Sequence, residues 1–148
     1  MVVAADWAFI AGLLNGPASV FIRRRGLGRR ARHELVLKIY LTRDEGPEVT
    51  RWLKSVGRKP IQFGDAASPQ YGVTFIGPEA SKVLAKCFDR LHSRRRRAQA
   101  QHAFAFNRTY QVGPDGKALP GIRLTDEAFQ ARELAYWSLK SLNAKRRK

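Results

Sequence analysis

The chain has 148 residues, which is enough for one domain with a buried core. Apolar residues make up 44% of it, which excludes an intrinsically disordered chain. Lys and Arg number 28 against 12 Asp and Glu, and the formal net charge of +16 makes a folded domain repel itself. A polyanionic partner relieves this repulsion, so we expect nucleic acid as the partner rather than a solubility role for the charge.

The single cysteine, Cys87, excludes an internal disulfide and a cysteine-based zinc site, and it suits a reducing compartment. Residues 1–14 are apolar but lack the basic lead of a signal peptide, and they are too short to span a bilayer. We therefore expect an intracellular protein with no membrane partner and no cofactor. The sequence does not distinguish cytoplasm, nucleus or organelle.

The first predicted element is a helix that begins at an Asp6 N-cap and ends before Pro17, which cannot continue a helix. Its sequence is apolar all round, which indicates burial on most sides. Ala8, Gly12 and Gly16 share one face. Small residues at this spacing allow two helix backbones to approach closely.

Alternating sequence predicts a hairpin from residues 19–25 and 33–42, joined by a Gly- and Arg-rich turn at 26–32. One face of the second strand is uniformly apolar, so we expect it to be buried. That face comprises Leu35, Leu37, Ile39 and Leu41.

A helix over 46–57, a second hairpin from 60–63 and 70–76, and a helix over 78–91 follow. A basic run at 94–97 leads into a further helix that ends near residue 106. This order predicts an α+β domain with one four-stranded antiparallel sheet, covered by helices on one face.

After an irregular loop, Thr125 is the predicted cap of a last helix, with acidic residues in its first turn. Its predicted buried stripe comprises Ala131, Leu134, Ala135, Leu139 and Leu142. The domain is expected to cover residues 1–143, and residues 144–148 are expected to form a basic, disordered tail.

The uncovered face of the sheet is the first candidate binding surface. Strand alternation assigns to it Phe21, Arg23, Arg25, Glu34, Val36, Lys38, Tyr40 and Thr42, and, from the second hairpin, Gln62, Gln70 and Thr74. Arg can bind guanine edges and Gln can bind adenine edges, and a two-stranded ribbon fits the major groove of DNA. The alternative is an ordinary solvated sheet face.

Two clusters of arginine are candidates for phosphate contacts. The hairpin turn carries Arg29, Arg30 and Arg32 beside the strands that would read bases. The later run consists of Arg94, Arg95, Arg96 and Arg97, whose mutual repulsion a phosphate backbone would relieve. The alternative for the run is a solvated helix end.

The segment from Trp7 to Ser19, WAFIAGLLNGPAS, resembles the LAGLIDADG motif of homing endonucleases. The element order after it, the run at 35–42, the basic segment at 94–99 and the last helix at 129–143 resemble single-motif members of that family. The resemblance implies an αββαββα fold with a saddle-shaped sheet and additional C-terminal helices. It also implies a homodimer on double-stranded DNA with a pseudo-palindromic site. The implied dimer interface comprises Ala8, Ala11, Gly12, Asn15 and Gly16.

The resemblance fails where the family's chemistry takes place. Pro17 matches the position of the catalytic acid, and Asn15 matches the acidic position before it. Proline has no ligand atom, so we expect no metal site, no catalytic residue and no endonuclease activity. Arg96 matches, approximately, a basic residue that assists the family's active site, but it stays charged and is a poor proton shuttle. Only Asp44 and Glu45 could substitute as metal ligands, and they also suit the start of the next helix.

Three functions are consistent with these features. The favoured one is a non-cleaving, sequence-specific DNA-binding homodimer derived from a homing endonuclease, such as a transcriptional regulator. The second is an RNA-binding module, such as an intron-splicing cofactor or a ribosome-associated protein, which would hold A-form RNA through shape and phosphates. The third is a nuclease that uses Asp44 or Glu45.

Overall fold

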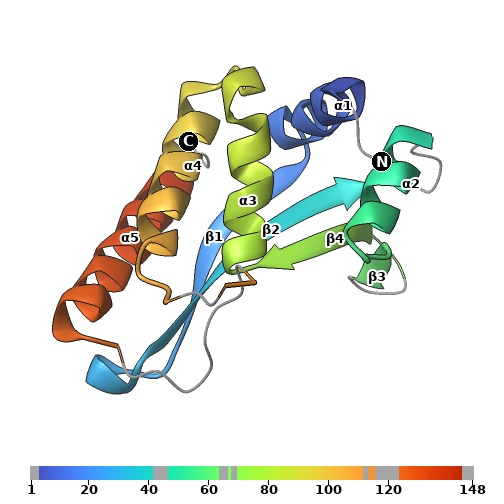
Figure 1. Cartoon of the computed structure of the whole chain (residues 1–148). Coiled ribbons are helices and arrows are strands. Elements are labelled where there is room, and N and C mark those ends of the chain that lie inside the picture. Colours follow the sequence, from blue (N-terminus) through green and yellow to red (C-terminus); the bar gives the residue numbers. More distant parts are fainter. Residues whose placement is uncertain are drawn as a thin grey trace.

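The computed structural model describes residues 4–41, 47–63, 67, 70–111, 114–115 and 124–144. Their secondary structure follows the predicted order (Figure 1). The α-helices are α1 (Ala4–Asn15), α2 (Pro47–Ser55), α3 (Pro78–Cys87), α4 (Arg94–Asn107) and α5 (Asp126–Ala144). The strands are β1 (Ala18–Arg25), β2 (Arg32–Leu41), β3 (Ile61–Phe63) and β4 (Gln70–Ile76), and the 3₁₀ helices are η1 (Gly28–Arg30) and η2 (Phe88–Arg90).

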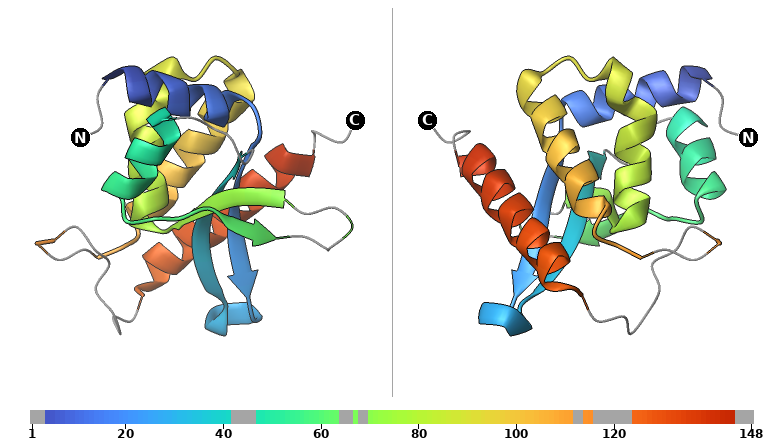
Figure 2. Two further views of the ribbon diagram at one scale, coloured as in Figure 1. Left: turned by 90° about the vertical axis from the view of Figure 1, so that its right-hand side faces the viewer. Right: turned by 60° about the vertical axis from the view of Figure 1, so that its left-hand side comes forward.

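The four strands form one antiparallel sheet in the order β1-β2-β4-β3, which confirms the predicted α+β architecture. α5 packs along the edge strand β1, and α3 packs on β2 and β4 (Figures 1 and 2). The β1–β2 hairpin extends well past the end of β4, because β4 pairs only with residues 36–41 of β2. The hairpin therefore projects from the rest of the sheet.

The hairpin turn requires glycine at two positions. Gly26 and Gly28 have φ angles of 88° and 60°, a left-handed conformation that other residues adopt only with strain. η1, which begins at Gly28, presents its arginines at the tip of the hairpin. The Gly- and Arg-rich composition of this turn thus serves both its backbone shape and its charge.

The core lies between the sheet and the helices. Leu35, Leu37 and Ile39 have no exposed surface, as the alternation of β2 predicts. On the helix side, Trp52 of α2 stacks on Phe75 of β4, with ring centroids 5.3 Å apart. Burial of each such large apolar side chain stabilises the fold by about 1.5–3 kcal/mol, which fixes which face of β2 remains uncovered.

The first helix begins at Ala4, three residues before Trp7, the first residue predicted to be helical. Asp6 is therefore inside the first turn, where it is completely buried and accepts a 2.7 Å hydrogen bond from Arg51 of α2. α1 is buried on most of its sides, as predicted, and only the face that carries Ala8, Phe9 and Gly12 is exposed. The pair Asp6–Arg51 fixes α2 against the N-terminal half of α1.

The buried stripe of α5 differs from the predicted one. Leu134 is 70% exposed and Ala131 is exposed, whereas Phe129 and Arg132 are buried together with Ala135 and Leu139. The predicted cap is correct, since the backbone N–H of Ala128 donates to Thr125 Oγ1. α5 includes Ala144, one residue beyond the predicted domain boundary, and the tail at 145–148 is outside the described residues. Within the described part of the chain, no helix is both long enough and apolar enough to span a membrane.

Candidate nucleic-acid interface

The face of the sheet opposite the helices carries the predicted side chains in rows that run across the strands. The register pairs Ser19 with Lys38 and Lys38 with Thr74, Phe21 with Val36 and Val36 with Ile76, Arg23 with Glu34, and Arg25 with Arg32. Most of these side chains are half-buried or exposed, in contrast to the fully buried residues that alternate with them. The rows confirm the predicted assignment of β1 and β2 to this face, which we call the open face.

Three predicted members of the open face do not contribute exposed surface to it in the described structure. Gln62 is opposite Tyr71 and accepts a hydrogen bond from its hydroxyl, so it points to the helix side of the sheet and the prediction was wrong. Val36 is on the correct face but has no exposed surface, because its cross-strand neighbours Phe21 and Ile76 flank it. Thr42 is outside the described residues.

In the second hairpin, Gln70 is exposed on the open face, and Thr74 is half-buried there beside Lys38. Ile61 of β3 is opposite Gly72 and is 56% exposed, so it belongs to the same face. Ile61 and Ile76 were not predicted here. The alternation of Gln70 and Thr74 in β4 could have identified Ile76, whereas the three-residue β3 has no pattern of its own that could identify Ile61. Tyr40 is half-buried opposite Gly72.

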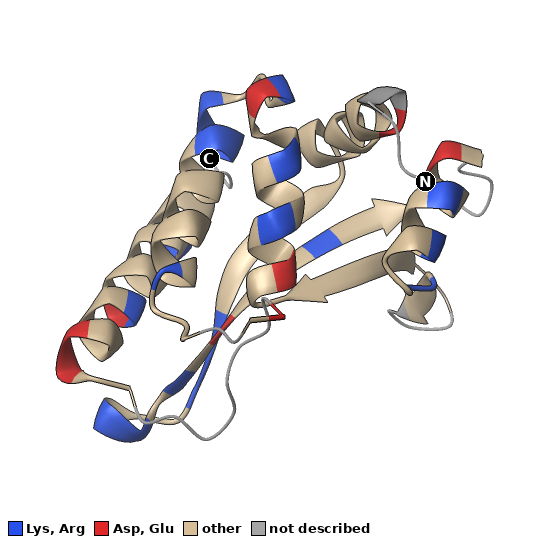
Figure 3. Ribbon diagram, in the orientation of Figure 1, with Lys and Arg blue, Asp and Glu red and all other residues tan. Residues whose placement is uncertain are grey.

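The charge of the open face increases toward the tip of the hairpin (Figure 3). Arg23 donates a 3.1 Å hydrogen bond to Glu34 directly opposite it, so this pair is locally neutral. The next row places Arg25 opposite Arg32, and both are exposed. Neither has a hydrogen-bond or ion-pair partner within the described residues. Like charges directly opposite each other destabilise a strand pair, so an anion beside this row would stabilise it.

The turn arginines divide into two kinds. Arg30 is exposed at the tip of the hairpin. Arg29 instead donates to the carbonyl oxygen of Leu124 and to Asp126, and its guanidinium lies 4.6 Å from the centroid of the Phe129 ring. Arg29 therefore connects the hairpin tip to the start of α5, and its side chain remains 44% exposed.

The run at 94–97 does not form one basic surface. Arg94 is exposed, but Arg95 donates 2.6 Å to the carbonyl of Leu142 near the end of α5, and Arg97 donates 2.8 Å to the carbonyl of Leu91. Arg96 is only 7% exposed and donates to the carbonyls of Gly16 and Ala18 and to Gln99. Assignment of Arg96 to phosphate contacts was therefore wrong. Successive helical residues are about 100° apart, so four arginines in a row cannot share one face.

Hydrogen bonds hold the end of α1 in place and occupy both polar atoms of the Asn15 side chain. Asn15 donates to the carbonyl of Arg90 and accepts from the backbone N–H of His92, so it connects α1 to the segment before α4. The carbonyl of Pro17 accepts a 2.8 Å bond from the N–H of Tyr40. Within the described residues no group of His, Cys, Asp or Glu is placed to hold a metal ion. Asp44 and Glu45 are outside that part of the chain.

α1, together with Gly16 just after its last residue, exposes a narrow face made mostly of small residues. Ala8, Gly12 and Gly16 are all exposed, and a Cβ added at Gly12 would meet no atom within 4 Å. Ala11 is only 1% exposed and packs in the core, so its predicted place in a dimer interface was wrong. Phe9, which the sequence analysis did not select, is 39% exposed on the neighbouring helix position.

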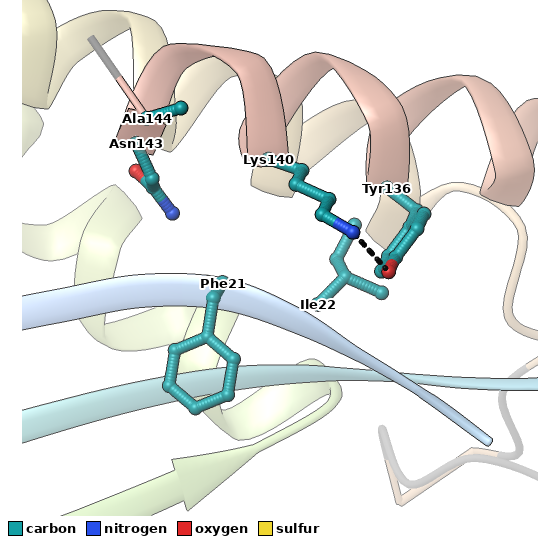
Figure 4. Close-up of a pocket in the computed structure, with 6 residues that line it drawn as sticks. All are labelled: Phe21, Ile22, Tyr136, Lys140, Asn143 and Ala144. Carbon is teal, nitrogen blue, oxygen red and sulfur yellow. Dashed lines mark hydrogen bonds between the residues drawn. The ribbon is translucent and has the colours of Figure 1, made fainter.

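A polar cluster of the half-buried Arg24 and Glu133 with the buried His33 attaches α5 to the helix side of the hairpin. Glu133 accepts a 2.7 Å bond from Arg24 and is 3.5 Å from the imidazole of His33. The hydrogen bond from Arg24 lowers the pKa of Glu133, and burial lowers the pKa of His33 despite the nearby carboxylate. At the other end of α5, a pocket of about 370 Å³ lies between this helix and β1 (Figure 4). The cluster of Arg24, His33 and Glu133 was not predicted from the sequence, because its members come from three separate elements, β1, β2 and α5.

No family model and no curated protein matches this chain. Among solved structures, the homing endonuclease I-CvuI in complex with its target aligns with a TM-score of 0.66 and 13% identity, over 93% of this chain and 82% of that one. The group I intron-encoded homing endonuclease I-CeuI complexed with DNA has a TM-score of 0.54 and 14% identity, over 73% of this chain and 56% of that one.

The archaeal intron-encoded homing endonuclease I-Vdi141I complexed with DNA aligns with a TM-score of 0.51 and 12% identity, over 95% of this chain and 98% of that one. At these identities the likeness concerns the path of the backbone. It agrees with the element order and with the motif-like sequence of α1. The chain therefore has the fold of the LAGLIDADG homing endonucleases.

Proposed function

We propose that this protein is a sequence-specific, double-stranded DNA-binding homodimer that does not cleave its target. The observation that carries the proposal is the opposed pair Arg25 and Arg32 on the open face, exposed and without an acidic partner in the described residues. DNA supplies the anion that this row lacks, since phosphates lie along both sides of the groove that a two-stranded ribbon enters.

The comparisons support duplex DNA as the polymer. I-CvuI, I-CeuI and I-Vdi141I were all solved in complex with DNA, and the chain shares their fold. The projecting hairpin has the form of a ribbon that can enter a major groove about 12 Å wide. The major groove of A-form RNA is too deep and narrow for such a ribbon, so RNA binding becomes an outcome to be tested.

The exposed face of α1 supports a homodimer. Its small residues, Ala8, Gly12 and Gly16, would let the backbones of two copies of the helix approach closely, and Phe9 adds apolar surface beside them. A two-fold axis through this contact would place the two open faces side by side, and the target would then carry two related half-sites.

The loss of cleavage is proposed from the residues at the end of α1. Pro17 has no side-chain oxygen, and Asn15 is a neutral amide already bonded to the Arg90–His92 segment. The guanidinium of Arg96 donates hydrogen bonds to backbone carbonyls, and because arginine stays charged near neutral pH it cannot shuttle a proton. The usual requirements of metal-assisted phosphodiester hydrolysis are therefore not met by these groups.

The test is a charge-removal pair measured against a matched control. Because each of the two copies loses two arginines, Arg25→Ala combined with Arg32→Ala should weaken binding to a selected duplex by at least about tenfold and lower the slope of log affinity against log salt by about 4. Lys82→Ala combined with Lys86→Ala removes the same charge from exposed positions of α3 on the helix side and should leave that slope nearly unchanged. Equal losses in both double variants would contradict the proposal, as would a structured RNA that outcompetes duplex DNA at equal salt.

A further inference from the structure

An apolar row crosses the open face between its polar rows. Phe21 of β1 is opposite Val36 of β2, which is opposite Ile76 of β4. Phe21 is half-buried, Ile76 is 41% exposed and Val36 is fully covered between them. Figure 4 shows that Phe21 points away from α5, whereas its neighbour Ile22 points toward the helix. The row is therefore directed to the side of the sheet that no described helix covers.

The rows on either side of it have different chemistry. Ser19, Lys38 and Thr74 form one, and the ion pair of Arg23 with Glu34 forms the other. Residues two apart along a strand are about 6.6 Å apart, roughly the rise of two base pairs in B-form DNA. Adjacent rows would thus face base pairs about two steps apart. The apolar row would therefore face a base pair that neither polar row faces.

An apolar side chain can recognise one feature of the major groove, because base edges there are otherwise hydrogen-bonding groups. That feature is the C5-methyl group of thymine. We propose that Phe21 and Ile76 form a thymine-methyl contact in each half-site, and that Val36 supports both side chains from between them. This inference rests on the proposed binding of duplex DNA and adds a determinant of its sequence preference.

The size of the effect follows from the area of one methyl group. Removal of one buried methyl or methylene costs about a fourfold loss of affinity. Substitution of deoxyuridine for thymine removes that methyl group and keeps the base pair intact. The proposal therefore predicts one position in each half-site where this substitution weakens binding about fourfold.

The experiment measures binding of the full chain to a duplex selected from a random pool, with deoxyuridine placed at each thymine in turn. The sensitive position should lose its sensitivity in Phe21→Ala and become less sensitive in Ile76→Ala. Lys38→Ala is the matched control on the neighbouring row, and it should retain the full methyl effect. Circular dichroism of each variant reports whether it is folded, and Ile76→Ala carries the test if Phe21→Ala does not fold.

Two results would overturn the inference while the proposed function stands. One is a selected duplex in which no deoxyuridine substitution weakens binding. The other is a methyl effect of the same size in wild type, Phe21→Ala and Ile76→Ala, since the contact would then belong to other residues. A chain that binds no duplex with sequence preference would overturn the inference together with the proposed function.

Discussion

The guanidinium of Arg96 donates a 2.9 Å hydrogen bond to the carbonyl oxygen of Ala18, across 78 residues of sequence. A second bond reaches the carbonyl of Gly16, so Arg96 holds both sides of the junction between α1 and β1. Its other nitrogen donates to Gln99, which in turn donates to Asn143 of α5. A residue that the sequence suggested for phosphate contact is the centre of a largely buried network that joins β1, α4 and α5 and reaches Gly16, just after α1.

Loss of this network should destabilise the fold. Arg96→Ala leaves two backbone carbonyls and Gln99 without their donor in a buried site, so we expect the free energy of unfolding to fall by about 3 kcal/mol. Arg94→Ala, at an exposed position of the same helix turn, should change it by less than about 0.5 kcal/mol. Urea denaturation of the two variants measures the difference, and similar values for both would contradict a structural role for Arg96.

The proposed dimer is tested at Gly12. The open space around this residue means that Gly12→Phe should fold, while its bulk should prevent the close approach of two α1 helices. Sedimentation equilibrium should show a dimer for wild type and a monomer for the variant. Ala105→Phe, an equal increase in size at an exposed position of α4, should remain dimeric. A monomeric wild type at working concentrations would contradict the dimer.

The absence of cleavage is a prediction about chemistry. With Mg²⁺ or Mn²⁺ present, wild type should bind its selected duplex and leave both strands intact, because Pro17 and Asn15 supply no carboxylate. Denaturing electrophoresis of the end-labelled duplex measures this directly. Magnesium-dependent cleavage that disappears in Asp44→Ala would establish an active nuclease.

Glu34 should limit affinity for DNA. Its carboxylate neutralises Arg23 and lies on the face that would meet phosphates. Glu34→Gln should therefore raise affinity for the selected duplex about fivefold at low salt, and the gain should shrink as salt increases. Glu79→Gln removes a comparable ion-paired carboxylate from the helix side and should have little effect. Affinity that is unchanged or lower in Glu34→Gln would argue against this orientation of the open face.

The His33 cluster should make stability depend on pH in the acid range. Burial lowers the folded-state pKa of His33, so the unfolded chain binds a proton first as pH falls below its ordinary value of about 6.5. Stability should therefore be full above that pH and decline as pH falls from there to the folded pKa. Arg24, Arg132 and Glu133 face the imidazole: the two arginines oppose its charge and the carboxylate favours it.

A second decline should follow below about pH 4.3, since the pKa of Glu133 is lowered by its hydrogen bond from Arg24 and the stabilisation is lost as that carboxylate is protonated. Thermal melting from pH 7 to about pH 2 should show both declines in wild type, and His33→Gln should remove the first. His92→Gln, at an exposed histidine, should keep it. If His33→Gln leaves the pH dependence of the melting temperature unchanged, His33 does not cause the first decline.

The sequence predicted the fold well because the alternation in β2 is strong. A strand with Leu35, Leu37 and Ile39 on one side has one way to bury them, and the opposite face follows by geometry. The predicted face of Gln62 was wrong because pairing with β4 sets the register of β3. A strand of three residues has no sequence pattern that defines a face.

The helices show why charge is harder to place than hydrophobicity. Arg132 takes a core position on α5, where its guanidinium lies 4.6 Å from the Tyr110 ring and its Nε donates to Thr109, while Leu134 is exposed. A pattern based on hydrophobicity assigns these two residues the other way round. Buried arginines depend on partners distant in sequence, so only the folded chain reveals which positive charges remain for a ligand.

The central claim is that the open face reads duplex DNA as a two-fold dimer. Selection from a random pool of duplexes, with a random RNA pool run in parallel at equal salt, tests it most directly. The account predicts enrichment of one duplex sequence built from two related, inverted half-sites, with no RNA of comparable affinity. Enrichment of structured RNA over every duplex, or duplex binding with no sequence preference, would contradict it.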